Sequence, residues 1–219
     1  SQGANSVAMG TYAGNWNQST GSVAIGQFAG SSSQGTQSIA IGSNSGQTSQ
    51  NNYCVAVGYL AGQMSQNVFS IAIGSGAGNW NQGTQSVAVG INAGTTGQGQ
   101  YSVAIGSYAG SGSQSTSCVA IGNNAGYTSQ NAYSIAIGSN AGNNKQSANS
   151  VSIGPGTGVT NQGFSSVAIG DQAGQTTQST QSIAIGLQAG QTTQGGNSIA
   201  IGPQAGQTNQ GSGGLALAI

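Results

Sequence analysis

The chain has 219 residues, but Lys145 and Asp171 are its only charged side chains and it contains no His. Charged residues make up 1% of the chain, against roughly 25% in a typical soluble protein. Because phosphate groups are bound by clustered Lys and Arg, this composition argues against nucleic acid as a partner and against an anionic membrane surface. The longest apolar run, residues 215–219, is far too short to span a bilayer.

A 16-residue unit repeats along the chain. The pattern Ser-Val-Ala-Ile-Gly begins at Ser6 and recurs at every sixteenth residue until Ser198, with Cys54 and Cys118 in place of two of the serines. We number the positions of each repeat from one, starting at this Ser. Such internal repetition is typical of solenoid and array architectures.

The repeat predicts one repeat domain over residues 1–219. Thirteen full repeats fill residues 6–213 without insertion or deletion, and partial repeats precede them at 1–5 and follow them at 214–219. Ala218 stands where the pattern calls for Gly, which indicates that the regular repeat ends there. Because the chain starts at Ser1 without a signal-peptide pattern, we expect a processed chain or part of a longer one.

Each repeat predicts one short β-strand at positions two to four, first at residues 7–9 and last at 199–201. A helical repeat needs more than about 30 residues, whereas β-branched residues bounded by Gly are typical of strands. The predicted fold is therefore all-β, a parallel β-solenoid with one repeat per coil and about 4.8 Å between rungs.

The apolar residues at positions two and four, such as Val23 and Ile25, point to one face of the predicted strand. We expect this face to form the dry interior. Positions five and nine are always Gly, which predicts a tight turn in which a Cβ would clash. Ala at position eight, replaced only by Ser45 and Thr157, predicts a small side chain inside that turn.

Position thirteen is Gln in every repeat, from Gln18 to Gln210, and Gln2 extends the column. Amides stacked one rung apart can hydrogen-bond along the axis and satisfy polar groups inside the coil. The column therefore predicts a structural amide ladder. A Gln array that recognises a ligand is the alternative.

Position three is Ala in every repeat except at Ser152. A half-buried strand alternates apolar with polar residues, so a small apolar residue on the second face indicates that another chain packs there. The alternative is that Ala is merely tolerated on an exposed face. The first interpretation predicts that Ala104→Gln breaks assembly while leaving a β-rich spectrum.

The Ser-Val-Ala-Ile-Gly core resembles the head repeats of trimeric autotransporter adhesins, and it also resembles the Gly/Ala/Gln-rich repeats of some viral and phage fibre proteins. The resemblance covers residues 6–213. It implies a left-handed parallel β-roll, three chains around a common axis, and a place on a cell or virion surface. The Ala-Gly at positions eight and nine and the invariant Gln are departures from the adhesin pattern, and adhesin head repeats are typically a little shorter.

The sequence offers no catalytic, cofactor-binding or metal-binding site, and we expect no enzyme activity. General acid–base catalysis near neutral pH needs a titratable group, but the chain has no His and one carboxylate. Metal sites need clusters of His, Cys or carboxylate groups. Asp171 at a turn position and Lys145 at position twelve are predicted to be solvated.

The two cysteines lie at position one, four repeats apart. At about 4.8 Å per rung they would be roughly 19 Å apart, too far for a disulfide within the chain. Cys54 and Cys118 are therefore predicted to be buried thiols in place of Ser. A bridge between equivalent cysteines near a symmetry axis is the alternative.

The variable positions are expected on the outer edges of the coil, and they carry columns of aromatic residues. Such columns shield the rim of a thin core or bind sugars. They comprise Tyr53, Phe69, Tyr101 and Tyr133 at position sixteen, Tyr12, Phe28 and Tyr108 at position seven, and Trp16 and Trp80 at position eleven.

Position eleven also carries a column of Thr, which would suit ice binding if it were flat. Trp16, Met64, Trp80, Gly112 and Asn144 interrupt it. The column comprises Thr48, Thr96, Thr128, Thr160, Thr176, Thr192 and Thr208. Separately, Asn17-Gln18-Ser19 is a sequon for N-glycosylation.

The sequence thus predicts a structural repeat protein that forms the shaft or head of an extracellular or virion fibre. Its expected partners are further copies of itself, in a homotrimer or a filament. A glycan- or receptor-binding adhesin head and a secreted ice-binding solenoid are the alternatives. No nucleic acid and no membrane span are expected.

Overall fold

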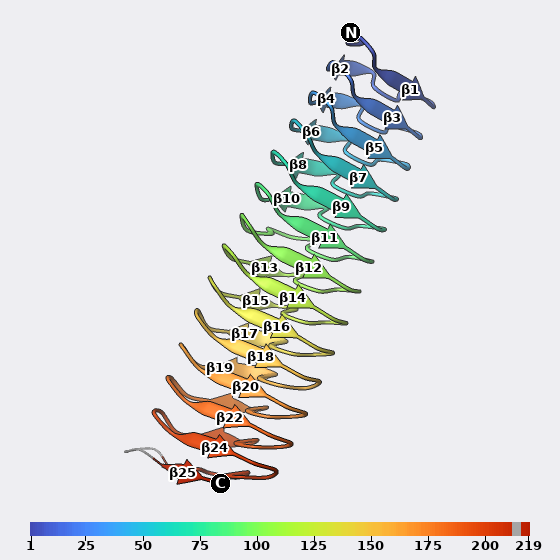
Figure 1. Cartoon of the computed structure of the whole chain (residues 1–219). Helices are drawn as coiled ribbons and strands as arrows, with labels where there is room; N and C mark the ends of the chain where they lie inside the picture. The colour runs from blue at the N-terminus through green and yellow to red at the C-terminus, as the bar shows by residue number, and fades with distance from the viewer. Residues whose placement is uncertain (212–215) are drawn as a thin grey trace. The chain divides into compact units, whose positions relative to one another are not determined.

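The structure, a computed structural model, describes residues 1–211 and 216–219. In these residues every regular element is a short β-strand. They form two compact units, Ser1–Ser113 and Gln114–Ile219. Each unit is a parallel β-solenoid with one 16-residue repeat per coil, which confirms the predicted fold class (Figure 1).

In the first unit, the strands at positions two to four form one parallel sheet. They are β1 (Val7–Met9), β3 (Val23–Ile25), β5 (Ile39–Ile41), β7 (Val55–Val57), β9 (Ile71–Ile73), β11 (Val87–Val89) and β12 (Val103–Ile105). A second parallel sheet is built from strands around positions eleven to thirteen. Its strands are β2 (Trp16–Gln18), β4 (Ser32–Gln34), β6 (Thr48–Gln50), β8 (Met64–Gln66) and β10 (Trp80–Gln82).

The second unit repeats this arrangement. Its first sheet contains β14 (Val119–Ile121), β16 (Ile135–Ile137), β18 (Val151–Ile153), β20 (Val167–Ile169), β22 (Ile183–Ile185), β24 (Ile199–Ile201) and β25 (Leu217–Ala218). Its second sheet contains β15 (Ser129–Gln130), β17 (Asn144–Gln146), β19 (Thr160–Gln162), β21 (Thr177–Gln178) and β23 (Thr193–Gln194). The short strand β13 (Ser113–Gln114) lies at the boundary of the units.

Strand register places identical repeat positions one above another. Val23 lies opposite Ile39, Ala24 opposite Ala40 and Gln34 opposite Gln50. In the second unit, Ile183 lies opposite Ile199 in the same way. Each column of the sequence is therefore a physical ladder along the solenoid.

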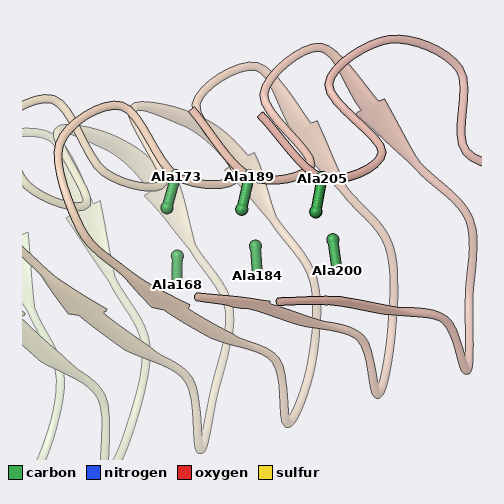
Figure 2. Close-up of a cluster of buried hydrophobic side chains, with 6 residues drawn as sticks. All are labelled: Ala168, Ala173, Ala184, Ala189, Ala200 and Ala205. Atoms are coloured by element: carbon green, nitrogen blue, oxygen red, sulfur yellow. The ribbon is translucent and has the colours of Figure 1, made fainter. Parts of the chain in front are cut away.

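The interior is lined by Ala, which corrects the predicted orientation of the first strand. Ala24, Ala40 and Ala72 at position three are fully buried, whereas Ile41 and Ile73 at position four are 36% and 40% exposed. Figure 2 shows the same arrangement in the second unit, where the position-three Ala168, Ala184 and Ala200 face the position-eight Ala173, Ala189 and Ala205. The Val and Ile side chains point outward.

The physical reason is the narrowness of the coil. The largest fully buried side chains are the Gln residues of position thirteen, apart from Thr157. Ala at positions three and eight leaves room for this long amide, and two columns of Val or Ile would fill that space. The prediction of a small side chain at position eight is confirmed, since Ala29, Ser45 and Thr157 are fully buried.

The Gln column binds the backbone first and its own neighbours second. Gln34 Nε2 donates to the carbonyl oxygens of Val23 at 2.7 Å and Ser38 at 3.3 Å. Amide-to-amide bonds along the axis occur in some rungs only, as from Gln50 Nε2 to Gln66 Oε1 at 3.1 Å. The predicted amide ladder is confirmed in part: the amide mainly joins the strand at position two to the start of the next repeat.

The predicted role of the position-five Gly is confirmed. Gly10 has φ of 128° and Gly26 has φ of 123°. A Cβ on Gly10 would lie 2.8 Å from the backbone of Gly26 in the next rung, closer than atoms can approach. Only Gly allows this backbone to stack on itself.

The last strand departs from the predicted regularity. Ile199 pairs with Leu217 and Ala200 with Ala218, so residues 18 apart face each other where all other pairs are 16 apart. Ala218 therefore occupies position three, and its interpretation as a replaced Gly at the end of the repeat is wrong. The last turn carries two additional residues; Gly214 and residues 212–213 lie outside the described part of the chain.

Candidate functional site

The charged side chains of the chain are dispersed and exposed. Lys145 lies in β17 and Asp171 follows β20, and both are exposed as predicted. Among the described residues there is no group of three or more His, Cys, Asp or Glu side chains that could hold a metal ion. The same residues include no helix suited to crossing a membrane. The candidate sites are therefore surfaces.

The outer face of the first sheet is an apolar surface. It is made by positions two and four, and we call it the outer apolar face. Val23 and Val55 at position two are partly exposed, and the position-four Ile105 and Ile201 are 38% and 43% exposed. No polar residue interrupts it within either unit.

This surface was assigned to the wrong column by sequence reasoning. The apolar columns on the outer face are those of the Val and Ile residues, because the Ala column lies inside. Ala104 is fully buried, so Ala104→Gln would disrupt the coil itself. The sequence could have predicted the buried Ala columns from the presence of two Ala columns and one Gln column in each repeat, because these side chains fit together inside a thin coil.

The cysteines lie in the interior, one in each unit. The thiols of Cys54 and Cys118 are fully buried. Cys54 Sγ lies 2.9 Å from the carbonyl oxygen of Asn67, in the place where the serines at position one make similar bonds. The prediction of buried thiols is confirmed, and the alternative of a bridge between chains is wrong because the sulfur atoms are not accessible.

Burial changes the acidity of both thiols. Desolvation raises the pKa of Cys54, and a weaker opposing effect comes from the hydrogen bond to Ser70. Desolvation likewise raises the pKa of Cys118, against hydrogen bonds around Ser134. Both groups are therefore protonated and unreactive near neutral pH.

The aromatic columns lie on the surface and form two stacked pairs in the first unit. The rings of Tyr12 and Phe28 are 5.1 Å apart and those of Tyr53 and Phe69 are 4.9 Å apart, with interplanar angles of 12° and 8°. Tyr53 and Phe69 remain 45% and 52% exposed. They therefore cover little of the core, and the ring faces between the partners of each pair are occupied.

Polar ladders cover another part of the second unit. Gln188 Nε2 donates to Gln172 Oε1 at 3.0 Å, and Gln191 Nε2 donates to Gln175 Oε1 at 3.2 Å. Thr176 and Thr192 of position eleven are exposed nearby in sequence. Sequence reasoning had not singled out these surface glutamines, although they recur at positions seven and ten.

Comparison with known proteins agrees with this architecture. Two stretches, residues 18–45 and 82–109, match the YadA head domain repeat. Both lie in the first unit. No curated protein and no solved structure matches the chain significantly. The two matched stretches confirm the resemblance to the head-type repeat of trimeric autotransporter adhesins, and they lie within the β-solenoid that this resemblance implied.

Proposed function

We propose that the chain is a non-enzymatic structural segment of an extracellular or virion-surface fibre. In this fibre, further copies of the chain cover the outer apolar face. The single observation that carries the proposal is that Val and Ile columns continue, rung after rung, on the outside of the coil while Ala fills the inside.

Covering this face is energetically favourable. Complete burial of a Val or Ile side chain contributes about 1.5–3 kcal/mol relative to full exposure. The residues of the face are already partly buried, so each has roughly half of this, about 1 kcal/mol, left to gain. Summed over many rungs, this gain exceeds the cost of association, which is estimated at about 4–15 kcal/mol.

A second copy of the same chain is the occupant that fits. It presents the same columns at the same rung spacing, so that ladders of two chains meet along their whole length. The near absence of charge removes the repulsion that normally keeps like surfaces apart. The match to a repeat of trimeric adhesins supports three chains rather than two.

The test is the mass of the protein in solution. We expect a trimer for the unchanged chain in sedimentation equilibrium. Replacing two outer residues, Ile41→Gln and Ile73→Gln, should weaken the association, so that monomer appears at higher protein concentrations than for the unchanged chain, while the far-ultraviolet circular dichroism stays β-rich. Ser75→Gln, at an exposed position just past β9, is the matched control and should remain a trimer.

Two results would contradict the proposal. One is a monomeric unchanged chain at micromolar concentration. The other is a double variant that associates as tightly as the unchanged chain.

A further inference from the structure

A shallow polar pocket lies at a corner of the coil in the first unit. Its volume is about 200 Å³. It lies where repeat positions twelve to fifteen of successive rungs meet, next to the strands β2, β4 and β6. Its walls are formed by Asn17, Ser19, Ser33, Gln34, Gly35, Gln50, Asn51 and Asn52.

The second unit has a similar pocket at the corresponding repeat positions. Its volume is about 210 Å³, and its walls include Thr193 and Asn209. A Gly at position fourteen lines each pocket: Gly35 in the first unit and Gly195 in the second. Each unit thus has a hollow of the same kind at these repeat positions.

The chemistry of the walls selects a neutral polar ligand. The lining side chains are amides and hydroxyls, and neither Lys145 nor Asp171 is among them. The side chains of Asn17 and Ser33 make no hydrogen bond to the described residues of the protein, so their polar atoms are available to a ligand. Amide and hydroxyl groups both donate and accept, as sugar hydroxyls do.

The size of the pocket limits what it can hold. Pockets for drug-sized ligands measure about 300–1,000 Å³, so this hollow accommodates one ring or one substituent of a larger molecule. A chain of sugars that contacts several rungs would gain affinity from repeated weak contacts. The aromatic columns suit this role less well, because the rings of Tyr53 and Phe69 stack on each other.

We infer that these corner pockets bind neutral glycans, each pocket holding one sugar unit through hydrogen bonds from amides and hydroxyls. The inference deepens the proposed function by giving the fibre segment an adhesive surface. It uses a different side of the coil from the outer apolar face, so binding and assembly can be tested separately.

The test compares two sets of Gly substitutions for binding to neutral trisaccharides. The pocket variant combines Asn17→Gly, Ser33→Gly and Asn209→Gly. These residues have φ of 53°, 61° and 51°, a region that Gly adopts readily, so the fold should tolerate the changes. The matched control replaces Asn44, Asn92 and Asn140, which have φ of 56°, 52° and 57° at position seven, by Gly.

The probes are chitotriose, cellotriose and maltotriose, with sialyllactose as a charged comparison, and binding is followed by saturation-transfer NMR. We expect saturable binding of at least one neutral trisaccharide. Its apparent affinity should fall at least tenfold in the pocket variant and stay unchanged in the control variant. The inference is overturned if no neutral probe binds, if both variants lose binding equally, or if only sialyllactose binds.

Sedimentation of the same samples separates this inference from the proposed function. The pocket variant should remain a trimer. A trimer that binds no neutral sugar would overturn the pocket assignment alone. A monomer that still binds sugar would overturn only the assembly proposal.

Discussion

Two invariant residues of the repeat depend on each other. A Cβ on Gly62 at position nine would lie 2.7 Å from Oε1 of Gln66 at position thirteen. The same close approach recurs at Gly190 and Gln194, at 2.8 Å. The Gly column is therefore needed to admit the Gln column.

The buried amides leave some carbonyl oxygens without a hydrogen bond. Gln34, Gln82 and Gln98 have a buried Oε1 that no group of the described chain contacts as a donor. One repeat solves this with a substitution: Ser152, in place of Ala at position three, donates to Oε1 of Gln162 at 2.5 Å. An unsatisfied buried acceptor costs about 1–3 kcal/mol.

Ala72→Ser should therefore stabilise the protein. Ala72 stands ten residues before Gln82, as Ser152 does before Gln162, so the new hydroxyl can donate to the unsatisfied Oε1. We expect the free energy of unfolding to rise by about 1 kcal/mol in denaturant titrations. Ala184→Ser is the control, because Oε1 of Gln194 already accepts from Gln178 at 3.2 Å; an equal gain in both variants would refute the explanation.

The two thiols make stability depend on pH. Burial raises the pKa of Cys54 and Cys118 in the folded chain, so the unfolded chain ionises first as pH rises. The stabilising contribution is complete below the unfolded pKa of roughly 8.5 and is lost as pH rises through the higher folded pKa.

We expect the free energy of unfolding to fall more steeply above about pH 8.5 in the unchanged chain than in a Cys54→Ser, Cys118→Ser variant. This variant restores the Ser found in the other repeats and leaves the rest of the chain unchanged. If the free energies of unfolding of the two proteins changed in parallel with pH, the thiols would not contribute to the pH dependence of stability.

At the scale of the element, the turn after each first strand is the most demanding part of the coil. Gly74 has φ of 124°, and a Cβ there would lie 2.6 Å from the carbonyl oxygen of Gly90. Other positions adopt positive φ with full side chains, among them Tyr101 at 59° and Lys145 at 58°. A φ near 58° lies in the left-handed region that L residues can adopt, whereas both the φ of 124° and the contact with the next rung exclude a side chain at Gly74.

Gly74→Ala should accordingly cost about 3 kcal/mol or more of the free energy of unfolding. The control is Gly97→Ala, because Gly97 also has positive φ, at 62°, but its Cβ would have nothing within 4 Å. That change should cost only the left-handed strain, about 1–2 kcal/mol. Thermal and chemical unfolding of the two variants would measure the difference, and equal losses would contradict the steric argument.

The sequence predicted the position of the first strand in each repeat, but it did not predict which face of that strand is buried. The strand at positions two to four follows from β-branched residues between glycines, and it lies where expected. The second strand, at positions eleven to thirteen, was not predicted, since polar runs such as Ser32–Gln34 carry no strand signal of their own. Its strand geometry comes from in-register stacking of successive repeats, as in the pairing of Gln34 with Gln50.

The prediction that Val and Ile face the interior was wrong for a related reason. Alternation shows that Val23 and Ile25 share one side of a strand, but which side is inner depends on how much volume the coil encloses. The candidate surface followed the same error: the apolar outer column was identified as Ala, whereas it consists of Val and Ile. The corner pockets could not be predicted, because they depend on gaps between rungs.

At the scale of the whole molecule, stability should follow from contacts between neighbouring rungs. Removing residues 54–69, one complete repeat, joins position sixteen to position one and leaves every column continuous. We expect this shortened chain to unfold cooperatively, with a small change in midpoint temperature.

Removing Ala56 alone is the matched control. It shifts the strand by one residue, so that side chains exchange the inner and outer faces. Differential scanning calorimetry should show a much larger loss than for the 16-residue deletion. Equal effects of the two deletions would contradict a stability based on rung contacts.

The 18-residue interval before β25 shows that the spacing of the repeat has one adjustable segment. Leu217 and Ala218 pair correctly with Ile199 and Ala200 despite two additional residues, and Gln210 Nε2 still reaches a main-chain oxygen, that of Ala216, at 3.1 Å. Strand phase is therefore kept, although five residues separate Gln210 from Ala216 where three separate position thirteen from the next position one in the other repeats. Peptides grafted into that segment of successive repeats would be presented one rung apart, as an ordered antigen array on an uncharged scaffold.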